Sequence, residues 1–177
     1  MRKLKNEELD RLSVEEYKEA KKSPIIIVLD NVRSMNNVGS AFRTGDAFRV
    51  EKIILTGITA KPPHREIHKT ALGATESVTW EYFEDTLQAI KHLKDEGYKI
   101  LAIEQADESV LLNQFKPDKN DKYAVVFGHE INGVSEKVVK AANTCLEIPQ
   151  IGSKHSLNIS VSIGISLWDI SQKLRLV

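Results

Sequence analysis

A short apolar run, a helical pattern and a second apolar run constrain the fold more than any other feature of this sequence. Residues 25–29 read IIIVL, a continuous apolar segment typical of a strand buried on both faces. Apolar and small side chains then recur at helical spacing over residues 37–48, and residues 52–57 (KIILTG) resemble a second strand. A strand, a helix and a strand in this order predict parallel strands and an α/β fold.

The same alternation continues toward the C-terminus. Helices are predicted at residues 85–96 and 134–142, and strands at 98–104, 123–128 and 145–148. These segments predict an α/β domain over residues 23–177, with a mostly parallel sheet flanked by helices. Residues 1–22 carry seven basic and six acidic side chains. They predict a charged helical extension, and an arm that grips RNA is the alternative.

The segment after residue 156 gives two conflicting signals. Apolar side chains alternate strictly with Asn, Ser and Gly from Leu157 to Leu167, and a period of two favours a strand. The run is long for a strand, however, and its apolar pattern continues further. In a helix, Ser156, Ser160 and Gly164 would form a stripe of small residues. We therefore predict a helix from about Leu157, buried on several sides by the domain and by a second copy of the chain.

Composition limits the class of protein. The formal net charge is zero, so a nucleic-acid partner would need a local basic patch. The one cysteine, Cys145, excludes an internal disulfide and a cysteine-based zinc site, and a small buried side chain is its favoured interpretation. No apolar run is long enough to cross a membrane, and no secretory signal is recognisable. We therefore expect a cytoplasmic protein without a membrane partner.

Three polar loops follow predicted strands, at residues 31–48, 127–136 and 148–160. Ligands of open parallel sheets bind outside the carboxyl ends of the strands, so these loops are candidates for one site. Taken singly, each has a plain structural interpretation as a helix cap, an Asn-Gly turn or an ordinary loop. Together they bring amides, hydroxyls, one arginine and one glutamate to the same edge of the sheet.

Familiar ligand motifs are missing. Gly128 and Gly133 do not make a phosphate loop, because no Lys-Ser/Thr pair follows them. No strand is followed by the glycine pattern of a dinucleotide site. His64 and His68 are four residues apart but lack the glutamate of a zinc-protease helix, so a metal pair there is the weaker interpretation and no metal site is predicted.

One segment is locally basic. Residues 61–69 read KPPHREIHK, in which Lys61, Arg65 and Lys69 outnumber Glu66. These three cations are candidate contacts to RNA phosphates, and an ordinary solvated surface is the alternative.

The pair His155-Ser156 raises the question of a hydrolase. A serine nucleophile normally sits on a sharp turn with its base far away in the sequence. Direct neighbours in a helix or strand point in different directions, so they rarely form such a pair. A hydrolase built on Ser156 is therefore the weaker interpretation.

The three loops together are similar to three ordered motifs of one enzyme family. NNVGSAFRTGDAF (36–48) resembles the first motif, VVFGHEINGVS (125–135) the second and IPQIGSKHSLNISVS (148–162) the third. On these motifs, over about residues 24–172, the chain resembles the SpoU (TrmH-like) branch of the SPOUT methyltransferases. The resemblance implies methyl transfer from S-adenosylmethionine to a ribose 2′-hydroxyl in tRNA or rRNA. It also implies a C-terminal trefoil knot and a homodimer.

The resemblance implies roles for particular residues. Arg43 matches the key catalytic residue, often proposed as the general base. Because a guanidinium stays protonated at ordinary pH, gripping the adjacent phosphate and donating to the developing alkoxide is a sounder role. Asn37 and Asn158 are expected to position groups through their amides. Ser156 would hold the nucleotide or the loop, and Glu130 would orient Arg43 or balance charge near the sulfonium.

The implied cofactor is S-adenosylmethionine. The family positions that cradle it match Ile103, Glu104, Gly128, Ile148 and Leu157, where apolar walls and close backbone approach suit an adenine ring. A hydrogen bond from Glu104 to the cofactor ribose is our own expectation.

Two residues differ from those usual in the family. His129 and Gln150 are both expected beside the cofactor pocket. An RNA-binding module that has lost catalysis through these changes therefore stays open as an alternative function.

Overall fold

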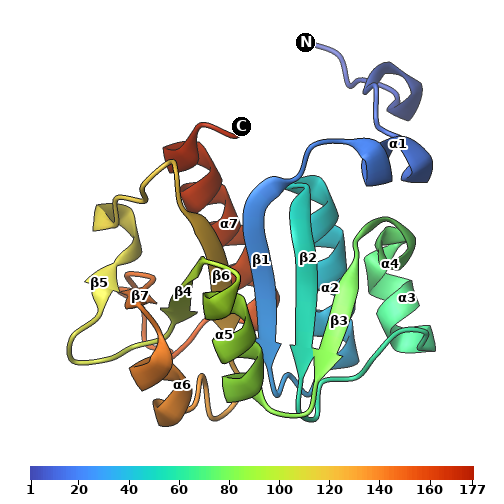
Figure 1. The fold of residues 1–177 in the computed structure, drawn as a ribbon. Helices are drawn as coiled ribbons and strands as arrows, with labels where there is room; N and C mark the ends of the chain where they lie inside the picture. Colours follow the sequence, from blue (N-terminus) through green and yellow to red (C-terminus); the bar gives the residue numbers. More distant parts are fainter.

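The predicted βαβ unit is present and continues into a fully parallel sheet. The computed structural model describes residues 1–177 apart from the side chain of Asn6. Its strands lie in the order β3-β2-β1-β6-β4-β7-β5, and every neighbouring pair is parallel (Figure 1). The strands are β1 (Ser23–Asp30), β2 (Val50–Thr56), β3 (Trp80–Phe83), β4 (Tyr98–Ile103), β5 (Val110–Leu111), β6 (Lys122–Phe127) and β7 (Thr144–Glu147). The α/β class is confirmed.

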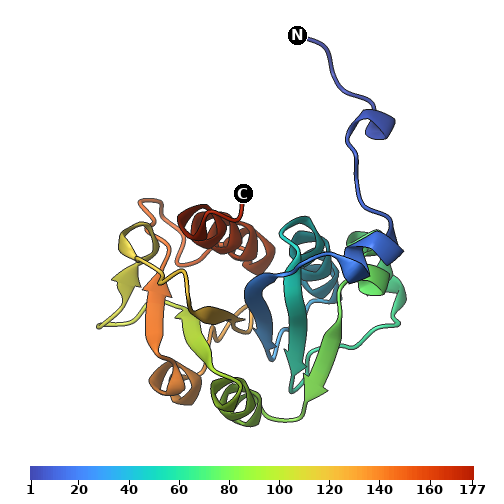
Figure 2. The ribbon, with the colours of Figure 1, turned by 45° about the horizontal axis from the view of Figure 1, so that its top comes forward.

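Helices cover both faces of this sheet. Figure 2 shows α2 and α7 on one face and α5 and α6 on the other. Ile25, Ile27 and Leu29 of β1 belong to the core on the side of α2 and α7, whereas Ile26 and Val28 belong to the opposite core. This burial of both faces accounts for the unbroken apolar run of β1. The helices are α1 (Val14–Glu19), α2 (Met35–Ala47), α3 (Arg65–Ala71), α4 (Ala74–Ser77), α5 (Thr86–Asp95), α6 (Glu136–Ala141) and α7 (Ile159–Leu174).

The C-terminal segment is a helix, as predicted. It begins directly after Asn158, whose side-chain oxygen accepts a hydrogen bond from the Ser160 backbone N–H at 2.9 Å. Ile163, Leu167 and Ile170 are fully buried and lie at helical spacing toward the sheet. The alternating apolar residues therefore fall on two faces of one helix, a buried face with Ile163 and Leu167 and an outer face with Val161 and Ile165. In the described residues, no helix is long and apolar enough to cross a membrane.

The outer face of α7 is exposed in a single copy of the chain. Val161, Ile165 and Trp168 are 47%, 38% and 54% exposed. A side chain added at Gly164 would meet no atom outside the helix within 4 Å. In a single copy of the chain the outer face of α7 is therefore uncovered, and its burial by a second copy stays a prediction.

The N-terminal extension is helical only in part. It contains a 3-10 turn at Asn6–Glu8 and α1, which a capping box between Ser13 and Glu16 begins. Tyr17 is only 4% exposed and joins the core, and α1 contacts α4. This one aromatic side chain anchors the extension, while the division of the chain at residue 22 stays a prediction.

The sequence patterns do not predict the short elements α3, α4, β3 and β5. The helices α3 and α4 are separated by Leu72 and Gly73, which both have positive φ. The side chains of β3 are all half-buried, because this strand forms the edge of the sheet and pairs only with β2. Neither a buried run nor an alternation marks such a strand.

Candidate active site

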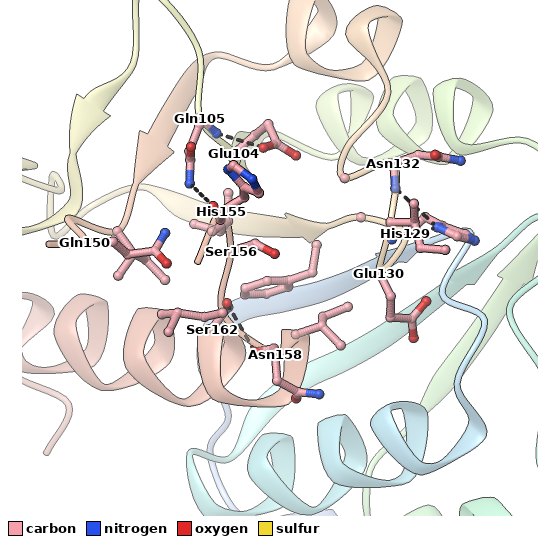
Figure 3. A pocket seen from close by; sticks show the side chains of 18 residues that line it. Glu104, Gln105, His129, Glu130, Asn132, Gln150, His155, Ser156, Asn158 and Ser162 are labelled. Carbon is pink, nitrogen blue, oxygen red and sulfur yellow. Dashed lines mark hydrogen bonds between the residues drawn. The ribbon is translucent and has the colours of Figure 1, made fainter. Parts of the chain in front are cut away.

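A cavity of about 590 Å³ lies at the carboxyl ends of β4, β6 and β7, which are neighbours in the sheet. Residues 103–105 enter it from the end of β4, residues 127–133 from the end of β6 and the loop after it, and the remainder from the loop after β7 and the start of α7 (Figure 3). This edge is where open parallel sheets bind ligands. The volume is in the range of small-molecule sites.

Most of the residues predicted for the site meet here. All five residues expected to hold a cofactor line the cavity, namely Ile103, Glu104, Gly128, Ile148 and Leu157. Three of the residues expected in catalysis, Glu130, Ser156 and Asn158, line it too. His129 and Gln150, expected beside the pocket, are also among the lining residues.

Gly128 lets two stretches of backbone touch beneath the cavity. A Cβ at this position would lie less than 3.0 Å from the backbone of Gly133 and Val134. The His129 and Gly133 backbones exchange two hydrogen bonds, of 3.0 and 2.8 Å, so the intervening residues form a tight turn. A residue without a side chain at position 128 is therefore needed to fold this wall of the cavity.

Glu104 fastens the same turn to β4. Its carboxylate accepts hydrogen bonds from the backbone N–H groups of Val134 and Gln105, each at 2.8 Å. The carboxylate thus has a structural role that the sequence does not reveal. It still lines the cavity, so the expected bond to a cofactor ribose stays a prediction.

Glu130 joins the second motif to the first. Its carboxylate accepts hydrogen bonds from the backbone N–H of Arg33 at 3.0 Å, the backbone N–H of Ser34 at 2.9 Å and Asn37 Nδ2 at 2.9 Å. Burial on its own would raise the pKa of Glu130, but these hydrogen bonds outweigh burial and lower that pKa below its usual value. The side chain is therefore a carboxylate at neutral pH and adds negative charge to the cavity wall.

Asn37 extends this network to the third motif. Its Oδ1 accepts a hydrogen bond from Asn158 Nδ2 at 3.4 Å, and Asn158 in turn caps α7. Glu130, Asn37 and Asn158 thus form a chain of side chains, one from each motif. The Asn37–Asn158 hydrogen bond connects two residues that are 121 positions apart in the sequence. The expected role of these amides in positioning a ribose stays a prediction.

Arg43 lies outside this cavity. Its exposed side chain lines a second depression, of about 320 Å³, together with Asp46, the turn at Leu72 and part of the N-terminal extension. The expectation that Glu130 orients Arg43 is not met within one copy of the chain, because the carboxylate binds the start of α2 instead.

Two further lining residues have roles that sequence patterns miss. Gln105 Nε2 donates to the His155 backbone oxygen at 2.7 Å and so ties the loop after β7 to the end of β4 (Figure 3). His129 Nδ1 accepts the Ile131 backbone N–H at 3.0 Å and shapes the turn after β6. The only available signal is position, since each residue lies two positions after the end of a strand, β4 or β6, and these strands are neighbours in the sheet.

The structure gives no support to Ser156 or Cys145 as a catalytic nucleophile. Ser156 and His155 both line the cavity, but no hydrogen bond joins them in the described part of the chain. Cys145 is half-buried, and burial raises the pKa of its thiol, so it lacks the character of an activated nucleophile.

The predicted basic segment lies near α3, away from the first cavity. Arg65 and Lys69 are exposed one turn apart on α3, and Lys61 Nζ lies 4.0 Å from the centre of the Tyr82 ring. His64 Nδ1 accepts the Glu66 backbone N–H at 3.2 Å and caps α3. Among the described residues, no cluster of three or more His, Cys, Asp or Glu side chains could hold a metal.

A model of the SpoU rRNA methylase family matches residues 24–168. The chain belongs to this family. For this member, the family implies that the C-terminal segment containing α7 is threaded into a trefoil knot.

Relatives and solved structures agree with this membership. The chain is 28% identical over 151 residues to the tRNA (guanosine(18)-2′-O)-methyltransferase of Borreliella burgdorferi, covering 85% of this chain and 67% of that protein. The TrmH/SpoU tRNA modifying enzyme of A. aeolicus superposes with a TM-score of 0.80 at 26% identity, covering 92% of this chain and 82% of that one.

An AdoMet-bound rRNA methyltransferase from Sinorhizobium meliloti gives a TM-score of 0.78 at 25% identity. That match covers 88% of this chain and 59% of the other. The chain spans between 55% and 69% of the lengths of the curated relatives that it matches. The SpoU domain is therefore shared, while the relatives contain further sequence.

Proposed function

We propose that this SpoU family member transfers a methyl group from S-adenosylmethionine to a ribose 2′-hydroxyl of tRNA or rRNA. The observation that carries the proposal is the cavity at the ends of β4, β6 and β7, where one side chain from each of the three motifs joins a single hydrogen-bond chain. The names of a tRNA 2′-O-methyltransferase relative and of an AdoMet-bound neighbour support the same substrate and cofactor.

The cavity lining fits S-adenosylmethionine. Ile103, Ile148 and Leu157 offer apolar walls to an adenine ring. Glu130, held ionised by its hydrogen bonds, and the nearby Glu104 supply negative charge that favours a positively charged ligand. When bound, this cofactor supplies an electrophilic methyl group on a sulfonium.

The remaining task of the protein is to orient a ribose and manage one proton. Asn37 and Asn158 hold the first and third motifs in register, so that groups on α2 and α7 keep a fixed relation. Ser156, at the cavity mouth, can donate a hydrogen bond to the nucleotide. Arg43 would grip a phosphate beside the reacting ribose and stabilise the alkoxide as its proton leaves, as a permanent donor rather than a base.

A second copy of the chain would complete this arrangement. The outer face of α7 exposes Val161, Ile165 and Trp168 at helical spacing, an apolar surface of the kind that marks interfaces. Trp168 packs edge-on against Phe48 at the end of α2, so this surface continues onto the helix that carries Arg43. In a two-fold dimer the same surface serves both copies. We propose that Arg43 of one copy acts at the cavity of the other.

Subunit mixing tests the proposed function and the shared site together. Arg43→Ala removes the guanidinium. Leu157→Trp puts a larger side chain into the cavity, at a lining residue that is 37% exposed and so can accept the added volume. Each variant alone should transfer no labelled methyl group from S-adenosylmethionine to unfractionated tRNA and rRNA. If Arg43 acts across the dimer, an equal mixture after subunit exchange should recover about a quarter of wild-type activity, because half of the dimers keep one intact site.

The outcomes separate the two parts of the proposal. If the mixture recovers no methyl-transfer activity, Arg43 acts at the cavity of its own copy and not across the dimer. Wild-type protein without methyl transfer to either RNA, although it binds S-adenosylmethionine, would refute the enzyme assignment. Arg43→Lys is the matched variant, since it keeps the charge but loses the paired N–H groups, and it should recover little activity.

A further inference from the structure

A cavity of about 500 Å³ lies at the β3 edge of the sheet, well away from the first. Trp80, the first residue of β3, lines it together with residues 62–65 and His68. Trp80 is half-buried and packs against the main core, whereas His64 and His68 are exposed. The core therefore holds the indole, while both histidines lie at the exposed rim of the cavity and His64 also caps α3.

The indole ring has room for a flat partner. The aromatic pairs found among the described residues do not include Trp80. Trp80 itself lines the cavity, so part of its indole borders space that a ligand can enter. The volume suits a small planar group, because ligand sites of this size hold whole small molecules.

Three cations lie on the segments that form this cavity, which the acidic Glu76 also lines. Arg65 lines the cavity itself, and Lys69 is exposed one turn further along α3. Lys61 lies just before the two prolines of the cavity wall, with its ammonium over Tyr82. An aromatic platform with cations beside it is the combination that binds single-stranded nucleic acid, through base stacking and phosphate contacts.

The cavity also adjoins the depression that contains Arg43. Glu76 of α4 lines both, so only this short helix separates them. An RNA strand that places a phosphate at Arg43 can therefore pass over α4 toward Trp80.

We propose that this cavity receives an unpaired base of the substrate RNA, stacked on Trp80, from a nucleotide near the methylated ribose. The proposal rests on the proposed function, since it assumes that the strand held at Arg43 is RNA. Trp80 is a binding residue in this scheme and takes no part in methyl transfer. The stacked base would fix which nucleotide presents its ribose to the first cavity.

Fluorescence can detect this contact directly, because the chain has only two tryptophans. In Trp168→Phe the emission comes from Trp80 alone, and in Trp80→Phe it comes from Trp168 alone. Single-stranded oligouridylate and unfractionated tRNA should quench Trp80 and leave Trp168 unchanged. An abasic ribose-phosphate oligomer of the same length should bind the cations without quenching Trp80.

Affinity supplies the second measurement. Trp80→Leu should weaken binding of these RNAs by about 5- to 150-fold, the range for loss of one stacked base, whereas Trp80→Phe should stay close to wild type. Because Trp80 also packs against the core, calorimetric binding of S-adenosylmethionine must be unchanged in both variants. If Trp80→Leu loses cofactor binding as well, the quenching comparison alone decides.

The outcomes distinguish this inference from the proposed function. Methyl transfer by the wild type without quenching of Trp80 by either RNA would overturn the stacking site and leave the enzyme assignment intact. Quenching by RNA in a protein that transfers no methyl group would support the stacking site and refute the enzyme assignment. Equal quenching by the abasic oligomer would also overturn the proposal, because no base would then be needed.

Discussion

Replacing Gly128 by alanine tests whether the turn after β6 builds the cofactor cavity. The added Cβ would lie less than 3.0 Å from backbone atoms of Gly133 and Val134, which have no flexible end to move aside. The turn must therefore open. Opening breaks the two backbone hydrogen bonds between His129 and Gly133 and pulls Val134 away from the Glu104 carboxylate.

The size of the effect follows from these contacts. Each backbone hydrogen bond contributes about 1 kcal/mol net, and overpacking a tight site costs about 1 to 3 kcal/mol. Because an opened turn can bind water instead, we expect the free energy of unfolding to fall by about 3 kcal/mol. A domain of this size has about 5 to 15 kcal/mol of stability, so G128A should still fold.

Urea unfolding and calorimetric titration with S-adenosylmethionine measure the two consequences. The matched control is Gly152→Ala, in a loop that borders the same cavity, where an added Cβ would meet nothing within 4 Å. G152A should change the free energy of unfolding by less than about 0.5 kcal/mol and keep cofactor binding. Wild-type stability and wild-type cofactor affinity in G128A would refute the argument that the touching backbones shape the cavity.

Three further predictions concern other parts of the molecule. Because hydrogen bonds lower the pKa of Glu130 below 4.5, its stabilising effect is complete above about pH 4.5 and is lost as the pH falls through the lowered value. Glu130→Gln should therefore be less stable than wild type at neutral pH, and the difference should disappear in strong acid; a gap independent of pH would contradict this. Gly164→Ala should stabilise the protein by up to about 1 kcal/mol, whereas Gly164→Leu should weaken a dimer in sedimentation experiments if the helices meet there. Lys69→Ala should lower the salt dependence of RNA binding by about 0.7 in the log–log slope if it contacts a single-stranded phosphate, and an unchanged slope would exclude that contact.

The sequence predicted the sheet because its signals were local. The unbroken apolar run of β1 reports burial on both faces, and the helix α2 follows within a few residues. β3 lacks such a signal because a half-buried edge strand is neither fully apolar nor alternating. The exposed face of α7 shows a different limit, since its apolar residues indicate burial but not which surface covers them.

The separation of Arg43 from the cavity has a simple geometric cause that the sequence already contained. Asn37 and Arg43 both lie on α2, six residues apart. In an α-helix this spacing turns the two side chains about 120° away from each other and separates them by about 9 Å along the axis. Asn37 is buried toward Glu130 and Asn158, so Arg43 must point elsewhere, and it is exposed. The first motif thus presents Asn37 and Arg43 to two different surfaces. In a dimer with a shared site, Asn37 of one copy and Arg43 of the other would both act on one ribose.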